Sequence, residues 1–125
     1  EDPRLLTGNG DYASDRKPDR ALHVAFRRSE RPHARILRID LEKAKASPGV
    51  VAVLSAQDLK DDFKPVIPYS RMPNYYATPI VPLAIEKVRY VGEAVVAVIA
   101  ETRYEAEDAV ELDGANDAEL PVAAE

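Results

Sequence analysis

The sequence predicts an α+β fold, with a small mixed sheet and two helices around one core. Two apolar runs, residues 50–54 and 94–100, have the length of strands and are rich in valine, a residue that strands favour. A capping box that starts at Thr102 indicates a helix directly after the second run. The 125 residues, of which 46% are hydrophobic, suit a single domain.

The first part of the chain predicts an arm followed by two strands. Residues 1–19 are polar and contain a glycine-rich turn signal, so we expect an extended N-terminal arm before a domain that covers residues 20–125. Residues 21–28 and 33–41 each alternate in a way that is typical of half-buried strands. One side of the first run carries its large apolar side chains, those of Leu22, Val24 and Phe26. The short turn between the two runs would allow them to pair as a hairpin.

Local signals place short helical segments on both sides of the first apolar run. Asp40 can cap a helix that continues to about Ser47, and the Pro-Gly pair at 48–49 would end it. The run at 50–54 is expected to be a buried strand. The sequence Ser-Ala-Gln-Asp at 55–58 has the spacing of a capping box, so one helical turn should follow.

Residues 60–82 are expected to form a long irregular loop, because four prolines between residues 65 and 79 exclude a central strand or a long helix. A loop of this length in a compact domain is usually functional, mobile or docked on another surface. It carries four large side chains with apolar surface, those of Tyr69, Met72, Tyr75 and Tyr76. Their exposure would indicate an interface, and the alternative is a loop that packs on its own domain.

The last third of the chain predicts two strands and a helix. Residues 88–91 lead into a turn or bend at Gly92, since glycine tolerates a positive φ. Residues 94–100 should form the central strand. The capping box at 102–105 should start a helix that ends near Leu112.

Composition argues against several classes of protein. The net charge of −5 and the absence of a basic patch argue against nucleic-acid binding. Without cysteine the chain cannot form a disulfide, ligate an iron–sulfur cluster or use a thiol nucleophile. No apolar run approaches the roughly 20 residues that span a bilayer.

Candidate sites for catalysis or ligation are weak. The sequence Gly-Asn-Gly at 8–10 lacks the lysine and further glycine of a phosphate loop, so a turn is the better interpretation. His23 and His33 would need further ligands to hold a metal. The carboxylates at 105–111 have the spacing of a solvated helix face.

Short motifs follow one another along nearly the whole chain. They are EDPRLLTGNGDY at 1–12, LHVAFRRS at 22–29, HARI at 33–36, PGVVAV at 48–53, PLA at 82–84, KVRYVGE at 87–93, VVAVIA at 95–100, ETRY at 101–104, AEDA at 106–109 and LP at 120–121. Each motif is weak alone, but their order and spacing are specific. Together they resemble the α/β-hammerhead domain at the N-terminus of the molybdenum hydroxylase large subunit, the family of xanthine dehydrogenase, aldehyde oxidase and carbon monoxide dehydrogenase. The arm and the loop look bacterial and nearer to the carbon monoxide dehydrogenase type than to the animal oxidases.

The end of the chain departs from the family's pattern. The family usually has a β-rich stretch after the closing helix, whereas residues 113–117 here are Asp-Gly-Ala-Asn-Asp. These residues are poor strand formers. We therefore expect residues 113–125 to be an atypical C-terminal tail, with the last strand missing, displaced or contributed differently.

The resemblance implies a non-catalytic domain of a molybdenum-dependent oxidoreductase. In the family a molybdopterin, often as a cytosine dinucleotide, and the glutamate base lie in larger domains that follow. No catalytic, cofactor-binding or metal-binding residue is therefore carried over to this chain. The resemblance implies packing on those domains, beside iron–sulfur and FAD subunits, in the cytoplasm. Candidate contacts with a partner or a substrate channel are Arg4, Tyr69, Met72, Tyr75 and Tyr76.

Two other functions stay open at this point. The first is a free-standing interaction module derived from the family, which the polar segment at 113–117 would support. The second is a small independent enzyme, which would need a pocket with convergent polar groups and a perturbed ionisable residue. The sequence indicates no such group.

Overall fold

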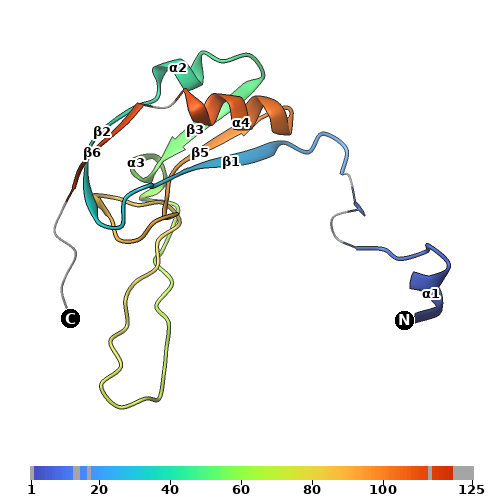
Figure 1. Cartoon of the computed structure of the whole chain (residues 1–125), viewed down its shortest axis with the longest axis horizontal. Helices are drawn as coiled ribbons and strands as arrows, with labels where there is room; N and C mark the ends of the chain where they lie inside the picture. The colour runs from blue at the N-terminus through green and yellow to red at the C-terminus, as the bar shows by residue number, and fades with distance from the viewer. Residues whose placement is uncertain (1, 13–14, 17, 113, 120–125) are drawn as a thin grey trace.

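A computed structural model describes the chain except for residues 1, 13–14, 17, 113 and 120–125 (Figure 1). The described residues form two three-stranded sheets and several short helices, which confirms the α+β class. The sheets are separate and all paired strands are antiparallel, whereas the sequence predicted one mixed sheet with two helices. In chain order the elements are α1 (Asp2–Leu6), β1 (His23–Arg28), β2 (Ala34–Asp40), α2 (Glu42–Lys45), β3 (Val50–Ser55), α3 (Ala56–Leu59), β4 (Lys87–Val88), β5 (Ala94–Ala100), α4 (Arg103–Glu111) and β6 (Gly114–Glu119).

The first sheet has the strand order β1-β5-β3, with the most apolar strand at its centre (Figure 1). In β5, Val98 lies opposite Ala25 of β1 and also opposite Val53 of β3. The helix α4 packs along β1 and β5, and its Ala109 belongs to the same buried core as Val98. The prediction of a central strand at residues 94–100 is confirmed.

The strand β3 lies at the edge of this sheet. The predicted strand is therefore confirmed, but the prediction that it is buried holds for only part of it. Val53 is buried against β5, whereas Val51 is 56% exposed at a register shift in the ladder. An edge strand has a neighbour on one side only, so a continuous apolar run does not guarantee burial.

The apolar side of β1 faces away from α4. Residues opposite each other in an antiparallel pair point to the same side of the sheet. Ala25 lies opposite Val98, a residue of the core beneath α4, so the alternate residues of β1 point the other way. These exposed side chains are Leu22, Val24 and Phe26. The alternation predicted the strand, but its apolar side forms surface.

The second sheet has the strand order β4-β2-β6, so β2 does not pair with β1 and the predicted hairpin is wrong. Instead, Ala34 of β2 lies opposite Val88 of β4, and β6 pairs along the other edge. The backbone of Ser29 explains the difference. Its N–H donates to the carbonyl of Glu93 at 2.9 Å, and its carbonyl accepts from the N–H of Gly92 at 2.8 Å. These bonds extend the pairing of β1 with the segment before β5, and the chain then enters the other sheet.

The strand β6 occupies the place where the sequence predicted an atypical tail. Its backbone pairs with β2, with Gly114 opposite Asp40 and Glu119 opposite Ala34. Of the alternatives that the sequence left open for the last strand, a missing strand is therefore excluded for residues 114–119. Ladder hydrogen bonds use only the backbone, so tertiary pairing overrides a low strand propensity. The rest of the predicted tail, residues 120–125, lies outside the described residues.

Capping signals located the helix starts well. The predicted capping boxes of α3 and α4 are both present. In α4, the N–H of Glu105 donates to Thr102 Oγ1 at 3.3 Å, and the N–H of Thr102 donates to Glu105 Oε2 at 3.0 Å. Before α2, Asp40 Oδ1 accepts from the N–H of Glu42 at 3.3 Å, although the N-cap position itself is Leu41.

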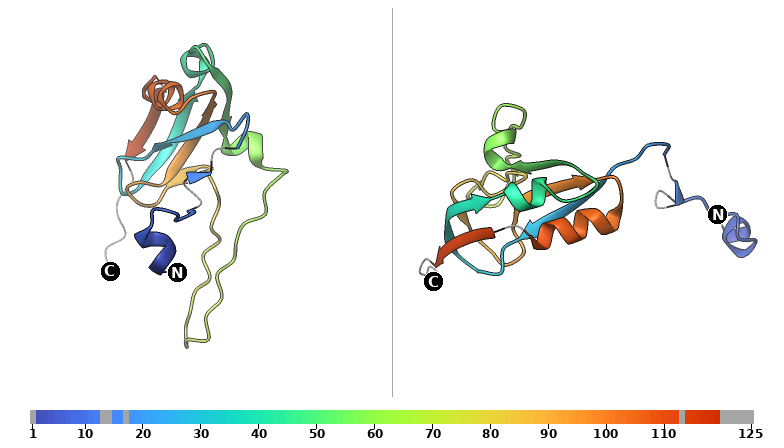
Figure 2. Two further views of the ribbon diagram at one scale, coloured as in Figure 1. Left: turned by 90° about the vertical axis from the view of Figure 1, so that its right-hand side faces the viewer. Right: turned by 90° about the horizontal axis from the view of Figure 1, so that it is seen from above.

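The N-terminal segment contains a helix, α1, that the sequence analysis missed. Pro3 suits the first turn of a helix. Gly8, with φ 72°, ends it in a Schellman motif, which confirms the predicted turn. The N–H of Gly8 donates to the carbonyl of Leu5 at 3.2 Å, and that of Asn9 donates to the carbonyl of Arg4 at 2.8 Å. Figures 1 and 2 place α1 well away from both sheets.

Candidate partner interface

The loop between α3 and β4 projects away from the two sheets (Figures 1 and 2). An isolated bridge joins its two arms, with hydrogen bonds of 2.9 Å and 2.8 Å between the backbones of Val66 and Ile80. The far end turns where the N–H of Tyr75 donates to the carbonyl of Met72 at 3.3 Å. Asn74 adopts φ 61° there, a left-handed conformation that asparagine tolerates better than most residues. The irregular loop predicted at 60–82 therefore has a defined, hairpin-like course.

We call residues 69–76 the loop tip. Its large side chains, which the sequence analysis selected, are all exposed: Tyr69, Met72, Tyr75 and Tyr76. Tyr76 is the most exposed of them at 93%. Arg71 is the only charged residue at positions 65–82, although 31% of the whole chain is charged. Tyrosine, methionine and arginine are enriched in protein interfaces, whereas lysine and the acidic residues are depleted.

Arg4 lies apart from the loop tip. It belongs to α1, which Figures 1 and 2 place far from the loop. Its neighbours around a shallow hollow are residues of the same segment, among them Leu5 and Tyr12. Of the five candidate contacts predicted from the sequence, the four in the loop tip therefore form one group, and Arg4 is separate from it.

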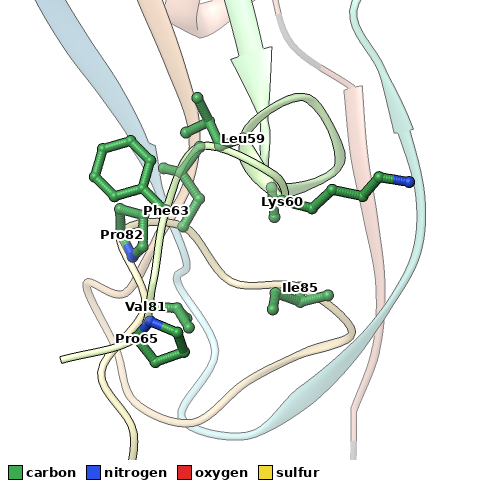
Figure 3. A pocket seen from close by; sticks show the side chains of 9 residues that line it. Leu59, Lys60, Phe63, Pro65, Val81, Pro82 and Ile85 are labelled. Atoms are coloured by element: carbon green, nitrogen blue, oxygen red, sulfur yellow. The ribbon is translucent and has the colours of Figure 1, made fainter. Parts of the chain in front are cut away.

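A hollow of about 170 Å³ lies at the base of the loop and is lined mainly by apolar side chains (Figure 3). Phe63 and Pro65 come from the outgoing arm, Pro82 and Ile85 from the returning arm and the segment after it, and Leu59 from α3. Pockets for small molecules usually measure roughly 300–1,000 Å³, so this hollow fits a side chain better than a cofactor. No sequence pattern indicates the hollow, because its walls are distant in the sequence and meet only in the fold.

The open side of β1 forms a second apolar surface. Phe26 lies there, and the guanidinium of Arg28 stacks 5.6 Å from the centre of its ring. Arg28 also donates to the carbonyl of Gly92 at 2.9 Å. The alternating pattern predicted this apolar side as part of a strand but did not predict that it lies at the surface.

Metal ligands and perturbed ionisable groups are features that often mark a catalytic site. In the part of the chain that the structure describes, no three His, Cys, Asp or Glu side chains come together as a possible metal site. Among the described residues, the pKa values that shift belong to exposed groups: Asp11 raises the pKa of Arg16, Glu107 raises that of Arg103, and hydrogen bonds from Ser55 lower that of Asp58. Within the described part of the chain, no helix has the length and apolar character needed to cross a membrane.

Comparison with known proteins shows a match over most of the chain. The family model described as "Aldehyde oxidase and xanthine dehydrogenase, a/b hammerhead domain" matches residues 7–115. The nicotine 6-hydroxylase large subunit of Paenarthrobacter nicotinovorans is 42% identical over 91% of this chain. The carbon monoxide dehydrogenase large chain of Afipia carboxidovorans is 43% identical over 98% of it.

The fold is also similar to that of solved enzymes of this kind. The structure of quinoline 2-oxidoreductase from Pseudomonas putida 86 superposes with a TM-score of 0.91 at 39% identity and covers 96% of this chain. This chain spans only 14% of the length of each of the two curated relatives and 15% of the solved chain.

Proposed function

Because this chain belongs to the aldehyde oxidase and xanthine dehydrogenase a/b hammerhead family, we propose that it is the non-catalytic N-terminal domain of a molybdenum-dependent hydroxylase or dehydrogenase. Its role is to pack on the domains that hold the cofactor, and by itself it turns over no substrate. The observation that carries this proposal is the projecting loop, whose exposed tip is apolar and nearly uncharged. Exposed apolar patches of this kind mark interaction sites.

The prolines of the loop support an interface role. Each arm carries a proline, Pro68 on the outgoing arm and Pro79 on the returning arm, and the tip carries Pro73. Proline fixes φ and limits the conformations of the free loop. A loop that is already restricted loses less entropy when it docks, so more of its contact energy contributes to affinity.

We propose that the molybdopterin, as its cytosine dinucleotide, is bound by the rest of the enzyme and not by this chain. The described residues do not fit such a group. The apolar hollow at the loop base is smaller than a usual cofactor pocket. The Gly-Asn-Gly turn at 8–10 follows the C-terminus of α1, where carbonyl groups point outward, so it offers no N-terminal dipole to a phosphate.

The proposed partners include iron–sulfur and FAD subunits of a bacterial complex. The chain has no cysteine, so any iron–sulfur cluster that serves the reaction would be bound by another domain or subunit. We place the complex in the cytoplasm. A chain without disulfides is compatible with the reducing conditions there.

The alternative is a free-standing interaction module derived from the same family. The polar segment at 113–117 would give it some support if the last strand were missing. Because β6 pairs with β2 from residue 114 to residue 119, that support is removed. The module would still bind a partner, but one without a cofactor, and the experiment below separates the two cases.

The test is to mix this chain with the cofactor-bearing remainder of a large subunit, prepared as a separate chain, and to measure association by light scattering and molybdenum by metal analysis. We expect a one-to-one complex that contains the metal. Tyr76→Ala should weaken it by about 30-fold, because buried tyrosines are frequent hot spots. Tyr104→Ala is the matched control, since Tyr104 is similarly exposed but lies on α4, and it should leave the affinity unchanged.

Two results would contradict the proposal. If the wild-type chain stays monomeric in the mixture, the assembly role is wrong. If Tyr76→Ala and Tyr104→Ala weaken the complex equally, the chain assembles through a surface other than the loop tip.

A further inference from the structure

Arg71 is an isolated charge on the loop tip. No acidic residue lies between Asp62 and Glu86 in the sequence, and Arg71 itself is exposed. Among the described residues it makes no ion pair and donates no side-chain hydrogen bond, whereas Arg16 and Arg103 each bind a carboxylate at 2.7 Å. Arg71 therefore presents a free guanidinium, with five N–H donors, at the end of an apolar projection.

The neighbours of Arg71 restrict how the tip can dock. Met72 follows it directly, and the Met72 N–H donates to Ser70 Oγ at 3.2 Å, which holds the backbone in a tight turn. Tyr69 and Tyr76 are the first and last residues of the loop tip and are 83% and 93% exposed. Because Arg71 lies between Tyr69 and Tyr76 within the loop tip, we expect a surface that covers the tip to cover Arg71 as well. A guanidinium that is buried without a partner opposes binding strongly, because its hydration is lost and not replaced.

We infer that the loop tip binds an apolar recess that contains a carboxylate, and that this carboxylate pairs with Arg71. The inference rests on the proposed function, because the recess belongs to the cofactor-bearing remainder of the enzyme. Charge complementarity favours a partner surface of this kind. A recess without an acid would leave the guanidinium of Arg71 unpaired. A wholly polar surface would not bury the apolar parts of the tyrosines and Met72. Arginine suits the role because its planar fork binds a carboxylate through two parallel hydrogen bonds.

The experiment is a titration of the full 125-residue chain into the cofactor-bearing remainder, followed by calorimetry at low and at high salt. Three variants are compared with the wild type: Arg71→Gln, Arg71→Lys and Arg103→Gln. We expect Arg71→Gln to weaken binding by about 30-fold or more, as for one partner of a buried charge pair. Arg71→Lys keeps the charge but loses the fork, so it should fall between wild type and Arg71→Gln. Arg103→Gln, which removes the same charge from α4, should bind like the wild type.

Salt distinguishes a buried pair from a charge at the rim. A buried pair is screened weakly, so the loss for Arg71→Gln should persist at high salt. A loss of less than about threefold, or one that disappears at high salt, would overturn the inference while leaving the assembly role in place. If the wild-type chain does not bind the remainder at all, both the assembly role and the recess are wrong. Circular dichroism of each variant checks that the domain is folded, which we expect because Arg71 lies outside the core.

Discussion

At the scale of single residues, Gly49 lies where the turn before β3 contacts the N-terminal cap of α4. It follows Pro48 in a tight turn in which the Val50 N–H donates to the carbonyl of Ser47 at 3.3 Å, and its φ is 72°. This φ suits glycine at the third position of a type II turn. A Cβ at this position would overlap the carboxylate of Glu105, the residue that closes the capping box of α4. One glycine therefore allows both the turn and the helix cap to form.

Replacement of Gly49 by alanine should consequently lower the free energy of unfolding by more than backbone strain alone would. The positive φ costs roughly 1–3 kcal/mol for a residue with a Cβ, and displacement of the Glu105 cap should add about 1 kcal/mol. Gly92→Ala is the matched control, because Gly92 has φ 93° but open space around its missing side chain. Urea unfolding of both variants measures the difference. If the two variants lose the same unfolding free energy, Glu105 does not limit the size of the side chain at residue 49.

At the scale of elements, local signals predicted more than long-range ones did. The capping boxes at residues 55–58 and 102–105 involve neighbours in the sequence, so the starts of α3 and α4 could be predicted. Strand partners could not, because an alternating run predicts a strand without naming its neighbour. Ser29 bonds to residues 92–93, far along the chain, and this pairing replaces the expected hairpin. The short helix α1 was missed although Gly8 provides a C-terminal signal.

The capping box of α3 makes a prediction about pH. The Ser55 side chain donates to Asp58 Oδ2 at 2.6 Å and the Ser55 backbone N–H donates to it at 2.7 Å, and these hydrogen bonds lower the pKa of Asp58. Because the folded-state pKa is lowered, the bonds stabilise the domain above the unfolded value of about 3.9. That contribution is lost as the pH falls through the lower, folded-state pKa.

Titration of the Asp58 carboxyl by NMR measures this effect directly. We expect its midpoint to lie below about 3.9 in the wild type and to move upward in Ser55→Ala, which removes the hydroxyl donor but keeps the backbone one. An Asp58 midpoint that is the same in both proteins would show that the serine hydroxyl does not hold the carboxylate.

At the scale of the whole molecule, the sequence predicted which part of the chain would form the candidate interface but not how it would be presented. The prolines and tyrosines of residues 60–82 indicated a functional loop from composition alone. The Val66–Ile80 bridge, the apolar hollow at the base and the exposed side of β1 depend on contacts between distant segments. Only the fold shows that the loop projects as one piece while α1 lies elsewhere (Figure 1).

The folded body and its projections also differ in what stabilises them. The core residues lie in the sheets, α2, α4 and the segment before β4, and the loop tip contributes none of them. Changes in the loop tip should therefore affect association without unfolding the domain, whereas changes such as Gly49→Ala should do the reverse. This separation allows assembly to be tested apart from stability.

The most direct test of the assembly role is amide hydrogen exchange of this chain, free and bound to the cofactor-bearing remainder, read by mass spectrometry. We expect the amides of the loop tip, residues 69–76, to exchange quickly in the free chain and to be slowed on binding, because docking excludes water from the tip. The amides of α4 should exchange alike in both states, since that helix is already packed on β1 and β5. Unchanged exchange in the loop, with new protection over the exposed side of α4, would contradict the account and move the interface to the opposite part of the domain.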